Sequence, residues 1–198
     1  KMIKIINYRG PDDEGYYIEN NIGFGHCRLS IIDLTYAGHQ PMKSNDNSLL
    51  IVYNGEIYNF IELRKELETL GYKFKSNTDT EVLLYSYKEW GENCVNKFNG
   101  DWAFAILDMN KKELFCSRDR FGVKPFYYFY DSKSFIFASE IKGLFCFETV
   151  SKKFDIQKVK RFIVWENWEH TQDTFFEGIM RLIPGYNLIL DLKTMRIS

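Results

Sequence analysis

The stretch LLIVYNGEIY, residues 49–58, is the clearest indication of the fold. Residues 49–53 are large and partly β-branched apolar side chains, which favour a buried strand. They lead directly into Asn54-Gly55, the dipeptide most typical of a two-residue hairpin turn, because both residue types tolerate a positive φ. Residues 56–58 would then begin the returning strand. We therefore expect a β-hairpin with its turn at Asn54-Gly55.

Strand and helix signals alternate on both sides of this stretch, which suits one α+β domain. Further strands are expected at 24–32, 103–109, 113–118, 126–130, 134–138 and 187–192. Helices are expected at 60–70 and 79–90, each preceded by a capping residue with Glu three positions later and followed by Gly, and at 155–164. The helix at 79–90 carries Asp79 in its first turn.

The composition is that of a globular chain. Its 198 residues are 45% hydrophobic, which is enough to bury a core, and its net charge of −1 gives no general attraction to nucleic acid or to an anionic membrane. The sequence contains neither an apolar run of about 18 residues nor a signal peptide at its start, so we expect a cytoplasmic protein. The four cysteines lie at least 22 positions apart without a CxxC pair, which argues against a zinc site or a disulfide framework.

Three places in the sequence have both a structural and a functional explanation. Strand alternation places His26, Arg28 and Ser30 on one face, and a buried arginine there needs an anion, either an internal carboxylate or the carboxylate of a ligand. Asn54-Gly55 is explained by a turn, or by two donors presented to a developing oxyanion. Asp79 is favoured by the helix dipole, or it binds a ligand ammonium group. The residues alone leave each pair of explanations open.

Taken together, seven ordered motifs resemble the glutamine amidotransferase domain of glutamine-hydrolysing asparagine synthetases. They are RGPDDEG at 9–15, GHCRLSIIDL at 25–34, GHQPM at 38–42, YNGEIYN at 53–59, TDTE at 78–81, RDRFGVKP at 118–125 and ASEIK at 138–142. The resemblance implies an α+β N-terminal-nucleophile hydrolase fold, a four-layer αββα sandwich with two antiparallel sheets. Residues 1–150 would form the glutaminase domain without its N-terminal segment. Residues 151–198, with TFFEGI and LIPG, would be its end and the bridge toward a synthetase domain.

The same resemblance implies a reaction and a set of site residues. Glutamine is hydrolysed to glutamate, and the ammonia supplies an ATP-dependent amidation of aspartate. Arg28 would bind the substrate carboxylate, Asp79 and Glu56 its ammonium group, and the Asn54 side chain with the Gly55 N–H would form the oxyanion hole. The backbone of Leu29, Ser30, Ile31 and Ile32 would line the same pocket, whereas Arg118, Asp119 and Glu140 would be structural or face the partner domain.

The nucleophile implied by the resemblance is an N-terminal cysteine whose own amino group acts as base. Cys27 does not fit this role, because it is internal and on the opposite strand face from Arg28. We therefore expect this chain to be part of a longer asparagine synthetase. The alternative is a non-catalytic glutamine-sensing or interaction module that lacks the nucleophile.

The resemblance also implies cofactors and partners. No cofactor is expected in this domain, whereas ATP and Mg are expected in the synthetase domain. The partners would be glutamine and a C-terminal synthetase domain of the same protein. A homodimer is allowed, and nucleic acid and membranes are not expected.

Overall fold

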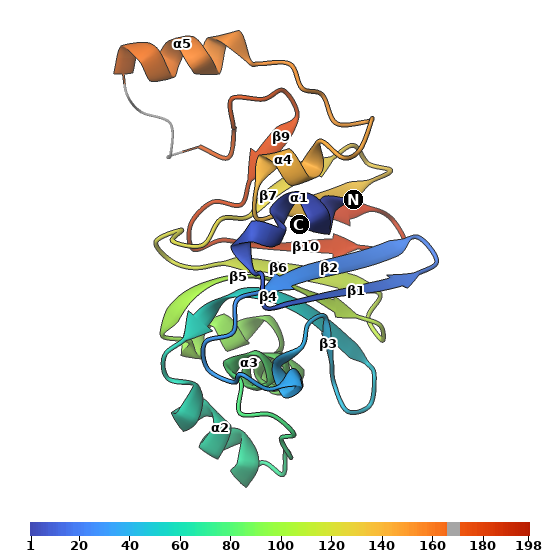
Figure 1. Cartoon of the computed structure of the whole chain (residues 1–198), viewed down its shortest axis with the longest axis vertical. Coiled ribbons are helices and arrows are strands. Elements are labelled where there is room, and N and C mark those ends of the chain that lie inside the picture. The colour runs from blue at the N-terminus through green and yellow to red at the C-terminus, as the bar shows by residue number, and fades with distance from the viewer. Residues whose placement is uncertain (166–170) are drawn as a thin grey trace.

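The centre of the molecule is a six-stranded sheet in which all strand pairs are antiparallel (Figure 1). The computed structural model describes residues 1–165 and 171–198. In sheet order the strands are β11 (Arg196–Ile197), β10 (Asn187–Asp191), β6 (Glu113–Arg118), β5 (Gly100–Asp108), β4 (Leu49–Ile57) and β3 (Met42–Lys43). The hairpin expected from 103–109 and 113–118 is confirmed, and so is the strand at 187–192. β4 and β5 are almost wholly buried because both of their faces are covered.

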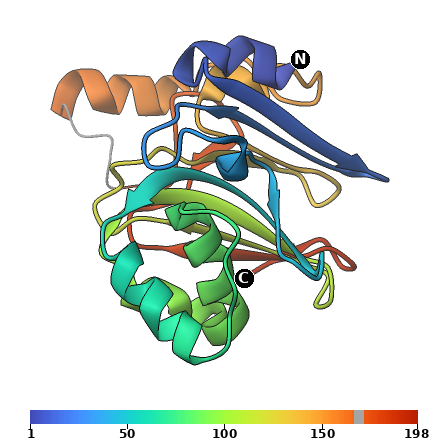
Figure 2. The same cartoon turned by 60° about the horizontal axis from the view of Figure 1, so that its bottom comes forward.

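Helices cover one face of this sheet (Figure 2). They are α2 (Phe60–Thr69), α3 (Asp79–Trp90) and the 3-10 helix η3 (Gly91–Lys97). Ile51 of β4 packs in one apolar cluster with Leu67 of α2 and Leu83 of α3. Both helices lie where the sequence predicts them, and α3 begins as expected, with the Thr78 hydroxyl accepting the N–H of Glu81 at 3.2 Å.

The cap expected for α2 is not formed. Asn59 precedes the helix, but its side chain makes no cap hydrogen bond. Instead its amide nitrogen donates to the carbonyl of Lys97 at 2.9 Å, and its amide oxygen accepts the N–H of Asn99 at 2.9 Å. Both partners are about 40 residues away in the sequence, so a local pattern could not indicate this competing interaction.

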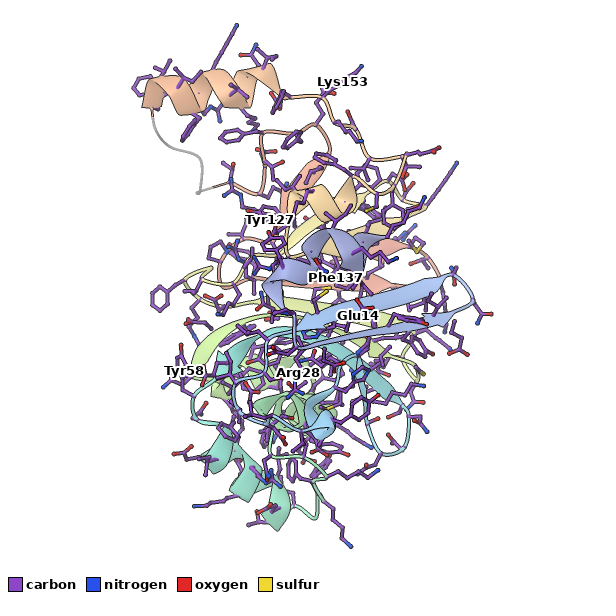
Figure 3. All side chains as sticks on the ribbon, in the orientation of Figure 1. Glu14, Arg28, Tyr58, Tyr127, Phe137 and Lys153 are labelled. Carbon is purple, nitrogen blue, oxygen red and sulfur yellow. The ribbon has the colours of Figure 1, made fainter. Side chains whose placement is uncertain are left out.

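A second β layer covers the other face. It consists of the hairpin β1 (Asp13–Glu19) and β2 (Ile22–Arg28), and of a sheet in the order β8 (Phe135–Ala138), β7 (Tyr127–Tyr130), β9 (Ile179–Arg181). Phe24, Val52 and Tyr128 share the apolar cluster between the two layers, and Phe137, labelled in Figure 3, packs against it. The expected hairpin at 126–130 and 134–138 is therefore confirmed.

Short helices form the outer side of the second β layer. They are α1 (Met2–Ile6), which continues into η1 (Asn7–Arg9), and α4 (Ile141–Leu144). A further 3-10 turn, η2 (Tyr36–Gly38), precedes β3, and α5 (Ile156–Trp165) occupies the helix position expected at 155–164. The order helix, sheet, sheet, helix confirms the α+β class with antiparallel sheets, although the second β layer is built from two separate pieces. In the described part of the chain no helix has both the length and the apolar character needed to cross a membrane.

The hairpin turn predicted at Asn54-Gly55 is wrong. β4 runs without interruption from Leu49 to Ile57 and pairs with β5 along its whole length, Asn54 facing Ala103 in the register. A Cβ at Gly55 would overlap the backbone carbonyl of Asp101 on the neighbouring strand. The glycine is therefore explained by a close approach of two backbones and not by a turn.

The strand predicted at 24–32 is too long. β2 ends at Arg28, and residues 29–32 lie in the loop that follows. In this loop the carbonyls of Asp33 and Thr35 accept hydrogen bonds from the Arg28 guanidinium, the latter at 2.8 Å. The alternation argument therefore applies to His26 and Arg28 but not to Ser30.

Candidate active site

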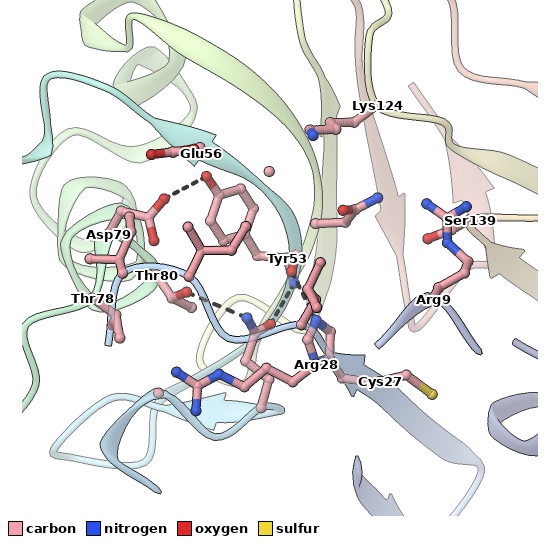
Figure 4. A pocket seen from close by; sticks show the side chains of 18 of the residues that line it. Arg9, Cys27, Arg28, Tyr53, Glu56, Thr78, Asp79, Thr80, Lys124 and Ser139 are labelled. Carbon is pink, nitrogen blue, oxygen red and sulfur yellow. Dashed lines mark hydrogen bonds between the residues drawn. The ribbon is translucent and has the colours of Figure 1, made fainter. Parts of the chain in front are cut away.

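A cavity of about 330 Å³ opens between the end of β2, the middle of β4 and the start of α3 (Figure 4). The site residues predicted from the sequence that line it are Arg28, Leu29, Ile31, Ile32, Asn54, Gly55, Glu56 and Asp79. Ser30 is not among the lining residues, and its N–H donates to the carboxylate of Asp12 at 2.7 Å. The fold therefore gathers residues that are up to 51 positions apart in the sequence, from Arg28 to Asp79, around one space.

The cavity lies along an open edge of β4. β3 pairs only with Leu50 and Ile51, so the following backbone groups on that side find other partners. The Tyr53 N–H donates to the side-chain oxygen of Gln40 at 2.7 Å, and the Ile57 N–H donates to Asp79 Oδ2 at 3.0 Å. In an antiparallel strand the N–H groups on one side recur at every second residue. The Gly55 N–H, midway between these two, therefore points to the same edge.

Asn54 presents a second donor beside it. Its Nδ2 atom is buried, and among the described residues it has no hydrogen-bond partner. A buried amide N–H without an acceptor costs free energy that a bound acceptor would recover. The Asn54 side chain and the Gly55 N–H are thus two neighbouring donors in one cavity, the arrangement that stabilises a developing negative charge on oxygen.

Asp79 is a buried carboxylate at the first turn of α3. Its Oδ2 atom accepts hydrogen bonds from the Tyr53 hydroxyl at 2.8 Å and from the Ile57 N–H at 3.0 Å. Burial raises the pKa of Asp79 and the negative charge of Glu56 acts in the same direction, while the hydrogen bonds from Ile57 and Tyr53 oppose the shift. A buried carboxylate with a second carboxylate nearby is a favourable place for a cation such as an ammonium group.

Arg28 is buried without an internal ion pair. Its guanidinium donates to the carbonyls of Asp33 and Thr35, and within the described residues no carboxylate oxygen lies within 4.0 Å of its nitrogens. The carboxylate of Asp33 is bonded instead to Thr35 and Asn77. A guanidinium has five N–H donors, so two carbonyls leave donors available for a ligand carboxylate.

His26, Tyr53 and Gln40 also line the cavity and were not singled out as site residues by the sequence. The His26 Nε2 atom donates to the carbonyl of Tyr53 at 3.0 Å, which leaves Nδ1 as an unprotonated acceptor, buried and without a partner in the described part of the chain. Loss of hydration lowers the pKa of His26 to about 4, so its ring is neutral near pH 7. The one indication in the sequence that His26 lies at the site was strand alternation, which places it on the same face as Arg28.

The far wall of the cavity carries Lys124 and Arg9 (Figure 4). Lys124 is held there by a loop organised around Asp119, a fully buried carboxylate that accepts the N–H groups of Phe121, Val123 and Lys124. Arg118 donates to the carbonyl of Lys124 at 2.7 Å in the same loop. Arg118 and Asp119 thus have structural partners in this loop, whereas Arg120 donates to the carbonyls of Phe98 and Val95.

Fold and cavity together define an α+β domain with a polar, small-molecule cavity that offers separate partners for a carboxylate, an ammonium group and a developing oxyanion. The family model of the glutamine amidotransferase domain matches residues 1–198. The chain belongs to this family.

Relatives of this chain carry a more specific description. It is 49% identical over 219 residues to the putative asparagine synthetase [glutamine-hydrolyzing] 2 of Methanocaldococcus jannaschii, a match that covers 100% of this chain and 41% of that protein. It is 39% identical to asparagine synthetase [glutamine-hydrolyzing] 3 of Bacillus subtilis, covering 100% of this chain and 32% of that protein. The chain thus spans less than half the length of either relative.

The fold is also found in solved amidotransferase structures. The glutamine phosphoribosylpyrophosphate amidotransferase of Bacillus subtilis superimposes with a TM-score of 0.59 at 23% identity, covering 89% of this chain and 34% of that one. At this level of identity the likeness establishes a shared fold and nothing about the substrate.

Proposed function

We propose that this chain is the glutaminase part of an asparagine synthetase, binding glutamine and releasing ammonia from its side-chain amide. The observation that carries the proposal is the complementarity of the cavity to three groups of one molecule. Arg28 provides donors for a carboxylate, Asp79 with Glu56 provides negative charge for an ammonium group, and Asn54 with Gly55 provides donors for an oxyanion. The 49% and 39% identity to glutamine-hydrolysing asparagine synthetases supports the same substrate.

The proposed reaction proceeds through a thioester. A cysteine thiolate attacks the carbon of the glutamine amide, and the negative charge moves to the amide oxygen, where the Asn54 side chain and the Gly55 N–H stabilise it. Collapse of this intermediate breaks the C–N bond, and the leaving nitrogen takes back the proton that the base removed from the thiol, so that ammonia departs and a thioester remains. Water then cleaves the thioester to glutamate and the free thiol. Loss of one oxyanion donor typically costs about 2.7 to 4 kcal/mol of transition-state stabilisation.

The remaining parts of the reaction are proposed for the longer protein. An N-terminal cysteine, with its own amino group as base, would supply the thiolate. A C-terminal synthetase domain would use ATP and Mg to activate aspartate for amidation by the ammonia. The glutaminase step itself needs only protein groups, and its location would be the cytoplasm, where free glutamine is available.

Arg28→Lys tests the ligand role of Arg28. Lysine keeps the positive charge but loses the planar fork that binds a carboxylate through two hydrogen bonds. We expect weaker binding of glutamine by calorimetric titration, with little change in melting temperature. A variant whose melting temperature falls strongly while its glutamine affinity is unchanged would show that Arg28 has a purely structural role.

The alternative function, a glutamine-sensing or interaction module, makes a different prediction for the longer protein. Such a module binds glutamine but releases no ammonia even with its complete N-terminus present. An ammonia assay on the full-length protein therefore distinguishes the two functions, since glutaminase activity supports the enzyme and binding without turnover supports the sensor.

A further inference from the structure

Tyr53 is fixed at three atoms by groups of the cavity wall. Its N–H donates to Gln40 at 2.7 Å, its carbonyl accepts from His26 at 3.0 Å, and its hydroxyl donates to Asp79 Oδ2 at 2.8 Å (Figure 4). Gln40 is itself tied to α3, because its amide nitrogen donates to the Thr80 hydroxyl at 3.4 Å. Tyr53 is 4% exposed and belongs to the apolar cluster under the helices. The position of the hydroxyl is thus set from both ends of the residue.

The Tyr53 hydroxyl helps to fix the orientation of the Asp79 carboxylate. Two of the donors to this carboxylate, the hydroxyl and the Ile57 N–H, use Oδ2. The backbone N–H of Thr80 is a further donor to the carboxylate. Two hydrogen bonds to one oxygen fix the plane and the direction of a carboxylate more closely than a single bond does. They also favour its ionised form over the neutral acid.

We propose that Tyr53 is a positioning residue for substrate selection, whose hydroxyl holds the Asp79 carboxylate ionised and oriented so that it recognises the α-ammonium group of the amino-acid substrate. This inference rests on the proposed binding of glutamine in the cavity. Burial and the nearby Glu56 both work against a charged Asp79, so the carboxylate needs donors to keep its charge. Ile57 and Thr80 supply backbone donors, and Tyr53 supplies the side-chain donor that a substitution can remove.

Tyr53→Phe removes this donor and keeps the ring that packs in the core. The matched control is Tyr58→Phe. Tyr58 also donates to a carboxylate at 2.8 Å, that of Asp101, but it is 54% exposed and lies at the periphery of the molecule, apart from Arg28 (Figure 3). Tyr58 is not among the cavity residues. Both variants lose a hydroxyl–carboxylate hydrogen bond, and only one of them loses it at the cavity.

The readout is binding of two ligands by calorimetric titration of the 198-residue chain. One is glutamine, and the other is 4-carbamoylbutanoate, which is glutamine without its α-amino group. A hydrogen bond to a charged group is strong enough that its loss should lower the glutamine affinity of Tyr53→Phe about tenfold. The affinity for 4-carbamoylbutanoate should not change, because this ligand has no ammonium group. Tyr58→Phe should bind both ligands as the unaltered chain does.

The pH dependence gives a second readout. The groups that face Asp79 are Tyr53, Glu56 and the backbone N–H groups of Ile57 and Thr80. Removal of the hydroxyl raises the pKa of Asp79 further, because a hydrogen bond that favours the ionised form is lost. Glutamine affinity falls as the pH drops through this pKa, so in Tyr53→Phe the fall should begin at a higher pH than in the unaltered chain.

Each outcome separates the inference from the proposed function. If the unaltered chain does not bind glutamine, the proposed function fails and the inference fails with it. If the chain binds glutamine but Tyr53→Phe binds it equally well, or loses both ligands alike, only the inference is overturned. If Tyr53→Phe does not fold, 3-fluorotyrosine at position 53 replaces it, since it retains the ring and a hydroxyl that is the stronger donor. Its fall in glutamine affinity should then begin at a lower pH, and an unchanged profile would overturn the inference.

Discussion

At the residue scale, the cavity concentrates polar groups whose hydrogen-bonding capacity the described chain does not fill. Asn54 has an unpartnered amide nitrogen, His26 an unpartnered ring nitrogen, and Arg28 a buried charge without a carboxylate. Each such group costs free energy in the folded protein, about 1 to 3 kcal/mol for a neutral group. A ligand that satisfies them would therefore bind with part of its free energy coming from relief of this cost.

For Asp79, the stabilising and ligand-binding roles make different predictions. The helix dipole favours the Asp79 charge by about 0.3 to 1 kcal/mol, and burial opposes it. Asp79→Asn should therefore change the free energy of unfolding at pH 7 by at most about 1 kcal/mol while lowering glutamine affinity by a larger factor. Because the pKa of Asp79 is raised in the folded state, any stabilisation from this carboxyl is present below pH 3.8 and lost as the pH rises.

Denaturation of the unaltered chain and of Asp79→Asn at pH 3 and pH 7 measures the effect on stability, and calorimetric titration measures the effect on glutamine binding. Equally small effects on stability and binding would leave Asp79 as a helix-terminal charge.

The neutral His26 ring predicts how stability depends on pH. Its pKa falls from 6.5 to about 4 on folding, so between these values the unfolded chain binds more protons than the folded one. Stability should therefore decrease as the pH falls through this window, by about 3 kcal/mol at 1.36 kcal/mol per pH unit. His26→Gln keeps a donor for the Tyr53 carbonyl and does not titrate. Urea denaturation from pH 7 to 4 should show a smaller decrease for this variant, and an identical decrease would contradict the prediction.

At the element scale, β4 shows what local sequence patterns can and cannot specify. The apolar residues at 49–53 correctly predicted a buried strand, and the capping pattern correctly placed α3 and with it Asp79. The prediction of a turn at Asn54-Gly55 was wrong because the glycine is required by the close approach of the Asp101 backbone. Asp101 lies 46 residues later in the sequence. The pairing with β5, together with the partners of the Tyr53 and Ile57 N–H groups, shows that the Gly55 N–H lies on the open edge of the strand.

Gly38 of the 3-10 turn η2 packs against the Arg28 side chain. A substitution of this glycine should therefore affect ligand binding more than stability. A Cβ at Gly38 would overlap the Arg28 guanidinium, and this side chain can move, whereas a Cβ at Gly55 would overlap the backbone of β5, which cannot. Gly38→Ala should therefore keep a melting temperature close to that of the unaltered chain and lose most glutamine affinity. Gly55→Ala should instead lower the melting temperature strongly. A Gly38→Ala variant with full affinity would show that Arg28 need not stay in its present position.

At the scale of the whole molecule, the two β layers bring the cavity together from motifs that are distant in sequence. The residues of these motifs and their order along the chain were sufficient to predict the α+β fold and the family. The sequence did not indicate that Gln40 and His26 fix Tyr53, since these contacts span 13 and 27 positions across separate elements. Such contacts follow from the packing of the layers and from no local pattern.

The cysteines of the chain lead to a prediction about catalysis by the 198 residues alone. A nucleophilic cysteine must be a thiolate within reach of the substrate. Burial raises the pKa of Cys94 to about 12 and raises that of Cys116 further, and both lie in the apolar clusters. Cys146 is not a cavity residue. Cys27 borders the cavity, but its thiol points to the carbonyl of Ile3, at 3.5 Å, and burial raises its pKa as well.

We therefore expect the 198-residue chain to bind glutamine without hydrolysing it. Calorimetric titration should show binding, an ammonia assay should show no release above buffer, and Cys27→Ser should leave both results unchanged. A longer form that carries the proposed N-terminal cysteine should release ammonia under the same conditions, because the thiolate and its base would then be present. Ammonia release by the 198 residues that disappears in Cys27→Ser would instead identify Cys27 as the nucleophile, and would require its thiol to turn from Ile3 toward Asn54 and Gly55.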